Sequence, residues 1–270
     1  MACCRNGRSC CKPIILLPGF PEFWYSWRHQ ILVFVESGFR VIATDHSGYN
    51  LSDCPHGTRP YRLDYLGRDI LSLIDPWGYE KVGLVGHDWG AGVAWWIAVN
   101  FPGRINHLAI LNVTHLSVMM ETLRKSPRQM LKSWYILFFQ IPALADWLLR
   151  LNNFFLVAKM LRSSGKSTTF TDEDIHEYHK AWTNSGGLTG TINWYRSLVR
   201  QRLPETTEIH IHVPKLILWG KLDVALTQDM AQKSINLCDN GQLKIFDDAT
   251  HWVQHDSAPA VNRELVEFFK

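Results

Sequence analysis

Six short apolar runs, separated mostly by stretches of helical periodicity, are the feature that most limits how this chain can fold. Each run has the length and the β-branched content of a buried strand rather than of a helix. The runs occupy 13–17, 40–44, 82–86, 105–111, 214–219 and 242–246. Strands that alternate with helices favour an α/β fold, a mostly parallel sheet with helices on both faces. With 270 residues, the chain is long enough to build one such body around a large core.

The gap between the fourth and fifth runs is far longer than the others. Residues 114–210 show helical periodicity and many aromatic side chains, but no convincing strand. We therefore predict an α/β core in two parts, 12–113 and 211–270, and between them a helical cap formed by residues 114–210. Because the cap lies between two consecutive strands, it interrupts the sheet without changing the order of the strands.

The segment 84–92, LVGHDWGAG, places a carboxylate at a turn between a strand and a helix. Its pattern is that of a nucleophile elbow, G-x-S-x-G, with Asp88 in the place of the serine. Gly86, Gly90 and Gly92 are expected to relieve crowding around this strained turn. A free aspartate has a pKa of about 3.9, so it is ionised at pH 7 and can attack carbon without a base. The alternative is that Asp88 only caps the helix.

Two charged residues and one turn follow other strands. The loops after the carboxyl ends of parallel strands meet at one edge of a sheet, where ligands usually bind. Asp223 follows the fifth run and His251 follows the sixth. The turn 18–21 follows the first run, where it could direct the Phe20 N–H group into a site. The chain order of nucleophile, acid and histidine is the order expected for this class of fold.

Each of these residues also has a plainer interpretation. Asp223 could cap a helix, and Asp247 or Asp248 lies nearer to His251 along the chain and could take its place. Asn112 follows the fourth run but supplies no negative charge, so a catalytic carboxylate at that position is excluded. Spacing along the chain does not show which of these side chains meet.

Six motifs make the chain similar to a known family. They are GFPEFWYSWRHQ (19–30), GHDWGAGVAW (86–95), FFQIP (138–142), LTGTINWYR (188–196), LILWGKLD (216–223) and THWVQHD (250–256). With these motifs the chain resembles the epoxide hydrolases of the α/β-hydrolase fold, most closely the animal members, over nearly all of residues 12–270. The resemblance implies an enzyme that converts an epoxide and water to a 1,2-diol without a metal or an organic cofactor.

The resemblance assigns a catalytic triad residue by residue. It makes Asp88 the nucleophile, Asp223 the acid that orients the histidine, and His251 the general base. Asp88 would attack an epoxide carbon to form an ester, and His251 would then activate the water that attacks the ester carbonyl. These residue types suit the two steps, because a carboxylate is already a nucleophile whereas water needs a base.

The resemblance also assigns the groups that bind oxygen. Tyr135 and Tyr195 in the helical cap would bind the epoxide oxygen, and the N–H groups of Phe20 and Trp89 would form the oxyanion hole. The alkoxide that an epoxide releases is a poor leaving group, and a phenol with a pKa of about 10 can donate to it at pH 7. Aromatic packing within the cap is the alternative interpretation of both tyrosines.

The sequence departs from the family pattern in three places. Pro18 stands where the family has a histidine that helps to fix the oxyanion turn. The loop 45–52 lacks the usual arginine and second glycine. Few residues precede Ile14, where the family places a two-strand hairpin, so we expect those N-terminal edge strands to be missing and one sheet edge to be open. A catalytically impaired or non-catalytic relative is therefore one alternative.

A haloalkane dehalogenase is the other alternative. Such enzymes share the fold, the Asp nucleophile and the Trp that follows it. A halide leaves without a proton and is held by indole or amide N–H donors, but Phe20 offers no side-chain donor and the cap offers tyrosines. The aromatic composition of the cap suits an apolar epoxide, with a lipid-derived one as a candidate. The oligomeric state is not readable from the sequence.

The charge and hydropathy patterns exclude some partners. The net charge is only +3 and the basic residues are scattered along the chain, so we expect no nucleic acid to bind. The longest apolar run, 134–141, contains Gln140 and falls short of the roughly 18 residues that span a bilayer. The start of the chain lacks the apolar middle of a signal peptide. We expect a cytoplasmic protein and leave peripheral membrane association open.

Two groups of residues could suggest a metal. The cysteines at positions 3, 4, 10 and 11 lack the Cys-x-x-Cys spacing of a zinc site, so we expect a tail open to acylation instead. His210 and His212 alternate before Val213 and leave a two-ligand site as a weak alternative. We predict no metal site.

Overall fold

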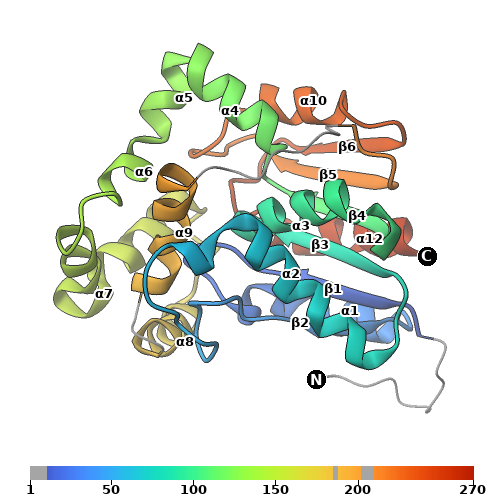
Figure 1. Ribbon diagram of the computed structural model, residues 1–270, viewed down its shortest axis with the longest axis horizontal. Helices are drawn as coiled ribbons and strands as arrows, with labels where there is room; N and C mark the ends of the chain where they lie inside the picture. Colours follow the sequence, from blue (N-terminus) through green and yellow to red (C-terminus); the bar gives the residue numbers. More distant parts are fainter. Residues whose placement is uncertain (1–10, 185–187, 202–209) are drawn as a thin grey trace.

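A computed structural model of the chain describes residues 11–184, 188–201 and 210–270. Within these residues six strands form one sheet, and all neighbouring strands are parallel (Figure 1). The strands are β1 Pro13–Leu17, β2 Arg40–Ala43, β3 Val82–His87, β4 Ile105–Leu111, β5 Lys215–Gly220 and β6 Gly241–Phe246. Their order across the sheet is β2-β1-β3-β4-β5-β6. Each apolar run is a strand within one residue at either end, so the predicted α/β class is confirmed.

Side chains alternate between the two faces of the sheet. On β1, Ile14 and Leu16 belong to one hydrophobic cluster, whereas Ile15 and Leu17 belong to another. All four are buried. The period of two is what strand geometry requires when both faces of a sheet are covered.

Helices supply the cover on each face. The pair α1 and α12 is in contact on one face, and the pair α2 and α3 is in contact on the other, in front of the sheet in Figure 1. The helices of the α/β core are α1 Arg28–Glu36, α2 Leu63–Ile74, α3 Trp89–Asn100, α10 Asp229–Ile235, α11 Val253–Asp256 and α12 Ala258–Phe269. Single turns of 3₁₀ helix lie at Trp24–Trp27, Arg59–Tyr61, Asp75–Trp77 and Pro102–Arg104.

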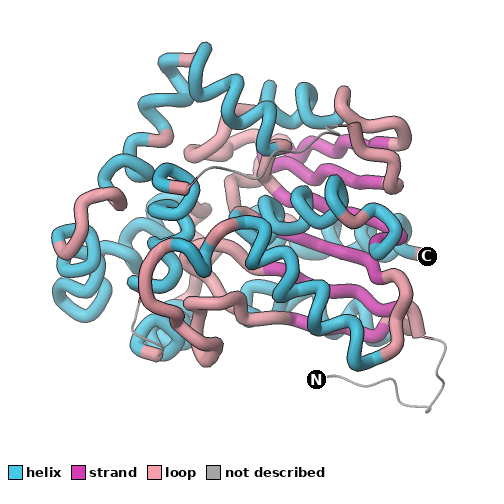
Figure 2. The backbone as a smooth tube through the Cα atoms, viewed as in Figure 1, coloured by secondary structure: helices cyan, strands magenta, loops and turns pink. Residues whose placement is uncertain are grey.

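Among the described residues between β4 and β5, the long regular elements are all helices, and loops connect them (Figure 2). The helices are α4 Leu116–Lys125, α5 Pro127–Lys132, α6 Trp134–Phe138, α7 Leu144–Ser164, α8 Asp172–Thr183 and α9 Thr189–Arg200. One isolated β-bridge joins Ile211 to Cys238. Non-helical angles at residues 151–154 break α7, and Asn152, Asn153 and Phe154 have positive φ there. The division of the chain at residues 114 and 210 remains a prediction.

A third hydrophobic cluster joins the helical cap to the core. It combines Phe20 and Trp252, from loops after β1 and β6, with cap residues such as Ile136, Trp182 and Tyr195. The Trp182 indole also donates a hydrogen bond of 2.7 Å to the Pro21 carbonyl. The cap is thus held over the edge of the sheet at which the strands end.

The short strand β2 forms one edge of the sheet. In the part of the chain that the structure describes, no strand pairs with its outer side. An open edge was expected from the sequence, and an unpaired row of backbone groups is a place where other strands can add. Of the N-terminal cysteines, those at positions 3, 4 and 10 lie outside the described residues.

Candidate active site

Asp88 lies on a strained turn between β3 and α3. Its backbone φ of 46° and ψ of −124° are angles that residues other than glycine rarely adopt. Two glycines make the turn possible, since a Cβ atom on Gly90 would lie 2.1 Å from the Leu17 carbonyl oxygen and one on Gly86 would lie 2.6 Å from the Ala91 Cα. Gly92 does not act in this way. A Cβ atom there would meet nothing closer than a Trp89 ring carbon at 3.9 Å, so the expectation for Gly92 is wrong.

The Asp88 carboxylate has contacts on two sides. The Phe20 N–H group donates to Oδ1 at 2.7 Å, and His251 Nε2 lies 3.5 Å from Oδ2. The predicted turn at 18–21 therefore does direct the Phe20 N–H group into the site. Trp89 opens helix α3, where the first backbone N–H groups have no partner within the helix. A helix start of this kind favours negative charge beside it.

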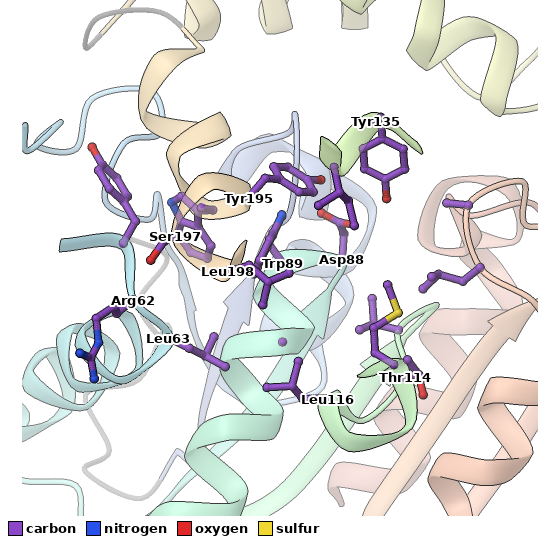
Figure 3. A pocket seen from close by; sticks show the side chains of 18 of the residues that line it. Arg62, Leu63, Asp88, Trp89, Thr114, Leu116, Tyr135, Tyr195, Ser197 and Leu198 are labelled. Carbon is purple, nitrogen blue, oxygen red and sulfur yellow. The ribbon is translucent and has the colours of Figure 1, made fainter. Parts of the chain in front are cut away.

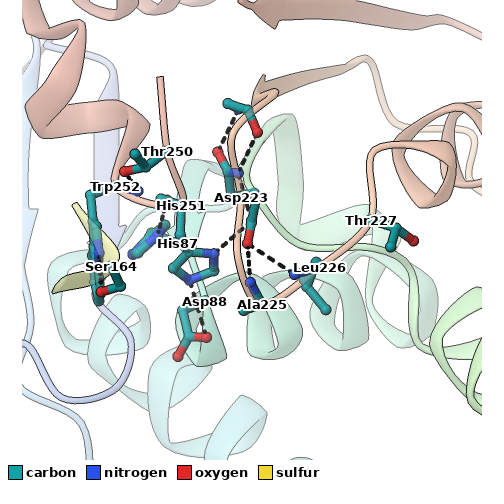
Figure 4. A network of polar contacts seen from close by, with 12 residues as sticks. His87, Asp88, Ser164, Asp223, Ala225, Leu226, Thr227, Thr250, His251 and Trp252 are labelled. Atoms are coloured by element: carbon teal, nitrogen blue, oxygen red, sulfur yellow. Dashed lines mark hydrogen bonds and ion pairs between the residues drawn. The ribbon is translucent and has the colours of Figure 1, made fainter. Parts of the chain in front are cut away.

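His251 bridges two carboxylates (Figure 4). Its Nδ1 atom lies 2.8 Å from Asp223 Oδ2, while Nε2 faces Asp88. Burial by itself would lower the pKa of His251, but Asp223 and Asp88 outweigh burial and raise it to about 10. The ring is therefore protonated at pH 7 as long as both carboxylates are charged.

Asp223 is fixed by four hydrogen bonds. Besides the bond to His251, it accepts from the Ala225 and Leu226 N–H groups at 2.7 and 2.9 Å and from the Asn112 amide at 2.8 Å. Burial tends to raise the pKa of Asp223, but His251 and these donors hold it below its usual value. The carboxylate thus stays charged although it is buried.

The two rival carboxylates point elsewhere. Asp247 pairs with Lys221 at 2.7 Å, and Asp248 pairs with Lys166 at 3.1 Å. Both side chains are largely exposed. Closeness along the chain to His251 therefore does not bring either one to the histidine.

Asn112 is a site residue that the sequence analysis did not assign. Its amide nitrogen donates to Asp223, and its Oδ1 atom accepts from the Gly220 N–H group at 2.9 Å. It thereby joins the end of β4 to the end of β5 and helps to orient the Asp223 carboxylate. Its place directly after β4 is the sequence signal that could have identified it. That position was tested only for a negatively charged side chain.

A buried polar cluster beneath His251 was missed as well. Glu22 accepts hydrogen bonds from Tyr178 at 2.6 Å, from His255 at 2.7 Å and from Gln254 at 3.2 Å, and His87 Nδ1 lies 3.4 Å away. Burial opposes the charge on Glu22, but the two histidines hold its pKa well below the usual range. The other ring nitrogen of His87 lies 3.0 Å from the backbone carbonyl oxygen of His251. The cluster therefore supports the loop that carries His251.

Tyr135 and Tyr195 enter the site from the cap. Figure 3 shows both phenolic side chains beside Asp88, with their hydroxyls on its side of the pocket. Their ring centroids lie 5.7 Å apart, and Tyr195 also meets Phe20 edge to face at 5.4 Å. Burial, with a smaller contribution from Asp88, raises the pKa of both phenols well above its usual value. Both hydroxyls are therefore neutral donors at pH 7.

A cavity of about 110 Å³ adjoins these groups, several times the space that one water molecule needs. Asp88, His251 and the two tyrosines line one part of it. The remaining walls are mainly apolar and include Leu63, Val113, Leu116, Met119 and Leu198. Such a cavity suits an apolar ligand with one reactive polar group.

The two unusual loops are held by contacts of their own. Asp45 accepts from the Trp24 N–H group at 2.9 Å and from the Asn50 amide at 2.8 Å, which closes the loop 45–52. Burial lowers the pKa of His46 to about 3, against a smaller effect of a hydrogen bond to the Pro18 backbone. A neutral imidazole from this loop thus supports the turn from which the family's histidine is missing.

The weak metal alternative does not gain support. His210 and His212 each contact an oxygen of Asp239 at 2.5 Å. No group of three potential metal ligands occurs among the described residues. In the same residues, no helix combines the length and the apolarity needed to cross a bilayer.

Comparisons with known proteins give one consistent family. A family model described as alpha/beta hydrolase fold matches residues 12–258. The AB hydrolase superfamily protein YfhM of Bacillus subtilis is 41% identical over 95% of this chain and 90% of its own length. Human Epoxide hydrolase 4 is 37% identical over 96% of this chain and 73% of its own length. The crystal structure of an epoxide hydrolase from Bacillus megaterium with an inhibitor matches with a TM-score of 0.88 and 30% identity, over 96% of this chain and 93% of that one.

Proposed function

We propose a function on one premise: this chain belongs to the epoxide hydrolase family of the α/β-hydrolase fold. The enzyme adds water to an epoxide and releases a 1,2-diol, and the reaction passes through an ester on Asp88. The observation that carries the proposal is the position of His251, 3.5 Å from the Asp88 carboxylate and 2.8 Å from the Asp223 carboxylate, in a site where two phenols lie beside Asp88 (Figure 3).

In the first step the carboxylate opens the epoxide. An oxygen of Asp88 attacks one ring carbon, the carbon–oxygen bond breaks, and the electron pair stays on the epoxide oxygen. Tyr135 and Tyr195 donate to that oxygen, and one of them gives it a proton. Because burial keeps both phenols neutral, the proton is present when the alkoxide forms. The protonated His251 then restores the proton of the phenol through water.

In the second step His251 acts as the base. Ester formation removes the charge of Asp88, and with it one of the two carboxylates that keep the ring protonated. The neutral ring takes a proton from a water molecule, and the resulting hydroxide attacks the ester carbonyl. The tetrahedral oxyanion is held by the N–H groups of Phe20 and Trp89, and the loss of one such donor typically costs about 10²–10³ in rate. The diol oxygen takes the proton from the ring, and the carboxyl proton of Asp88 then returns to His251.

The substrate is an apolar epoxide, and a lipid-derived one is a candidate. The apolar walls of the cavity support this class, since a polar substrate would lose its hydration there without replacement. We also propose the division into a core of residues 12–113 and 211–270 and a helical cap of residues 114–210. The contribution of Tyr135 and Tyr195 from one side and of Asp88 from the other supports it.

The ester route is tested by a single turnover in ¹⁸O water with excess enzyme and styrene oxide. The expected result is one heavy oxygen in the peptide that contains Asp88, because the attacking water adds to the ester carbonyl. Label in the diol alone, with an unlabelled Asp88 peptide after repeated turnovers, would contradict the route.

A separate assay distinguishes the dehalogenase alternative. The protein is incubated with styrene oxide and with 1-bromobutane, and diol and bromide are measured. We expect diol without bromide, because two phenols serve an alkoxide better than a halide. Bromide release at a comparable rate would favour the dehalogenase, and neither product would favour an impaired relative.

A further inference from the structure

The outer side of the cap carries a stripe of exposed apolar side chains. They follow one another at helical spacing along α5, α6 and the start of α7, and we call them the outer stripe: Met130, Trp134, Leu137, Ile141, Leu144 and Trp147. Trp134, Leu137 and Trp147 are 63%, 70% and 59% exposed. These helices run in succession along one side of the molecule, at the left in Figure 1.

The outer stripe is not part of the cap's interior. Other residues of the same stretch, such as Ser133, Ile136, Phe139 and Ala145, are buried instead. A surface helix normally turns its apolar face inward and a polar face outward, and isolated exposed apolar residues are common. Six along three successive helices, two of them tryptophans, are more than such isolated residues and point to a docking surface.

The same part of the chain is strongly basic. Residues 124–166 contain eight lysines and arginines and one acidic residue, a net charge of +7 in a chain whose total is +3. Three of these basic residues pair with acidic residues outside the range, Glu121, Asp172 and Asp248, and including these partners still leaves +4. Arg124, Arg128, Arg150 and Lys159 are exposed on the helices that carry or flank the outer stripe.

We propose that the outer stripe and the basic residues around it bind the surface of an anionic lipid bilayer. Exposed apolar side chains enter the boundary between headgroups and acyl chains, and lysine and arginine pair with anionic headgroups. Tryptophan favours this boundary because its ring is apolar and its N–H group is polar. A second copy of the chain is a poorer partner, since a symmetric contact would set the same excess of positive charge against itself.

The position of the stripe connects it to the cavity. On α6, Trp134 and Leu137 face outward, whereas Tyr135 lies at the pocket beside Asp88 (Figure 3). Bilayer contact through α6 would therefore bring the roof of the cavity to the lipid. The consequence that an apolar epoxide enters from the lipid phase rests on the proposed function, whereas the binding itself does not.

Vesicle flotation of the full chain tests the proposal. The vesicles are made of phosphatidylcholine alone or of phosphatidylcholine with 30% phosphatidylserine. We expect binding to the anionic vesicles that weakens as salt rises, and little binding to the neutral ones. The variant L137E/W147E should bind at least about tenfold more weakly, because a carboxylate is poorly tolerated in the bilayer and is repelled by the anionic headgroups.

Two control variants separate the stripe from general effects. L32E/L51E also exchanges two exposed leucines, on α1 and on a core loop, and should bind like the parent chain. R128S/K159S removes two charges from the cap and should weaken anionic binding, whereas K81S/R263S removes two exposed charges elsewhere and should not. Vesicle binding is read without any turnover, so its failure is distinct from a failure of the proposed function.

A position-sensitive measurement covers the case in which the glutamate variant fails to fold. Lipids brominated along the acyl chain should quench part of the tryptophan fluorescence of the parent chain. In W134F/W147F, which keeps the stripe apolar, binding should persist and most of that quenching should disappear. The proposal is overturned if the chain binds no vesicles, or if L137E/W147E binds them as well as the parent chain does. Unchanged quenching in W134F/W147F would also overturn it. So would a dimer of the parent chain in sedimentation that the single variant L137E dissociates, because the stripe would then bind a second copy.

Discussion

The two halves of the site are held in different ways. On the core side, Asp88, Asp223 and His251 lie in the turns and loops that follow β3, β5 and β6, and hydrogen bonds of defined length join them to backbone or side-chain groups. On the cap side, Tyr135 and Tyr195 are positioned mainly by edge-to-face contacts with other rings. Hydrogen bonds fix an angle and a distance, whereas aromatic packing tolerates small shifts. We therefore expect the core side to set the chemistry and the cap side to adapt to the substrate.

The strongest test of the core side is H251Q. Turnover should fall by about 10⁴–10⁶, the range found when a member of a catalytic triad is removed. The first step does not need the histidine as a base, so an enzyme adduct heavier by one epoxide should accumulate on the Asp88 peptide. The double variant D88A/H251Q is the control and should form no adduct. Loss of turnover without any adduct in H251Q would show that the histidine is required earlier than we propose.

Removing the phenols tests the cap side. The double variant Y135F/Y195F should lose about 10²–10³ of its turnover, a typical contribution of acid catalysis, and each single variant should lose less because the other phenol remains. Y65F changes a tyrosine on α2 outside the cavity and should have no effect. If a single variant were as inactive as the double one, only one phenol would act as donor, and the cap side would be as demanding as the core side.

The variant N112A tests whether the hydrogen bonds of the core side matter. It leaves the buried Gly220 N–H group without its acceptor and removes one donor from Asp223. The free energy of unfolding should fall by about 1–3 kcal/mol, as measured by urea denaturation. We expect kcat to fall by about tenfold, because Asp223 keeps its two backbone donors. N240A, at an exposed site, is the matched control, and an equal effect of both would refute the role of Asn112.

The last prediction concerns stability and pH. The pKa of His251 is raised to about 10 in the folded chain, against about 6.5 in the unfolded chain. The paired imidazolium therefore stabilises the fold fully below pH 6.5, and this contribution is lost as the pH rises towards 10. The difference in Tm between the parent chain and H251Q should shrink over that window in thermal unfolding. A constant difference would mean that the ring is neutral at rest.

The sequence predicted the parts of the molecule that depend on local pattern. The six strands follow from short β-branched runs, and the elbow at Asp88 follows from glycines at fixed offsets. Parallel strands then bring Asp88, Asp223 and His251 to one edge of the sheet, because all of them follow strand ends. The tyrosines have no comparable local signal, and their assignment came from the resemblance to a family.

The supporting residues were not predictable in the same way. Glu22, His87 and His255 are far apart along the chain, and each one alone resembles an ordinary polar residue in a loop or at a strand end. Their contact exists only after the loop that follows β1 and helix α11 have packed at the end of β3. Gly92 shows the opposite error, since a glycine that fits a motif was given a steric role that its open surroundings do not require.

The buried Glu22 cluster has a consequence for how the cavity opens. Tyr178 on α8 donates to Glu22 in the core, and Trp194 on α9 donates to the Ser47 carbonyl at 3.0 Å. If α8 moved away from the core, the buried Glu22 carboxylate would lose the Tyr178 hydroxyl as a donor. The free-energy cost of losing a hydrogen bond at a buried charge is larger than that of losing an exposed one. A movement of the whole cap as one rigid body would therefore carry this cost. We therefore expect a ligand to enter through small displacements of α6 and the start of α7. This stretch carries the exposed Trp134 and Trp147 and has neither of these two hydrogen bonds to the core.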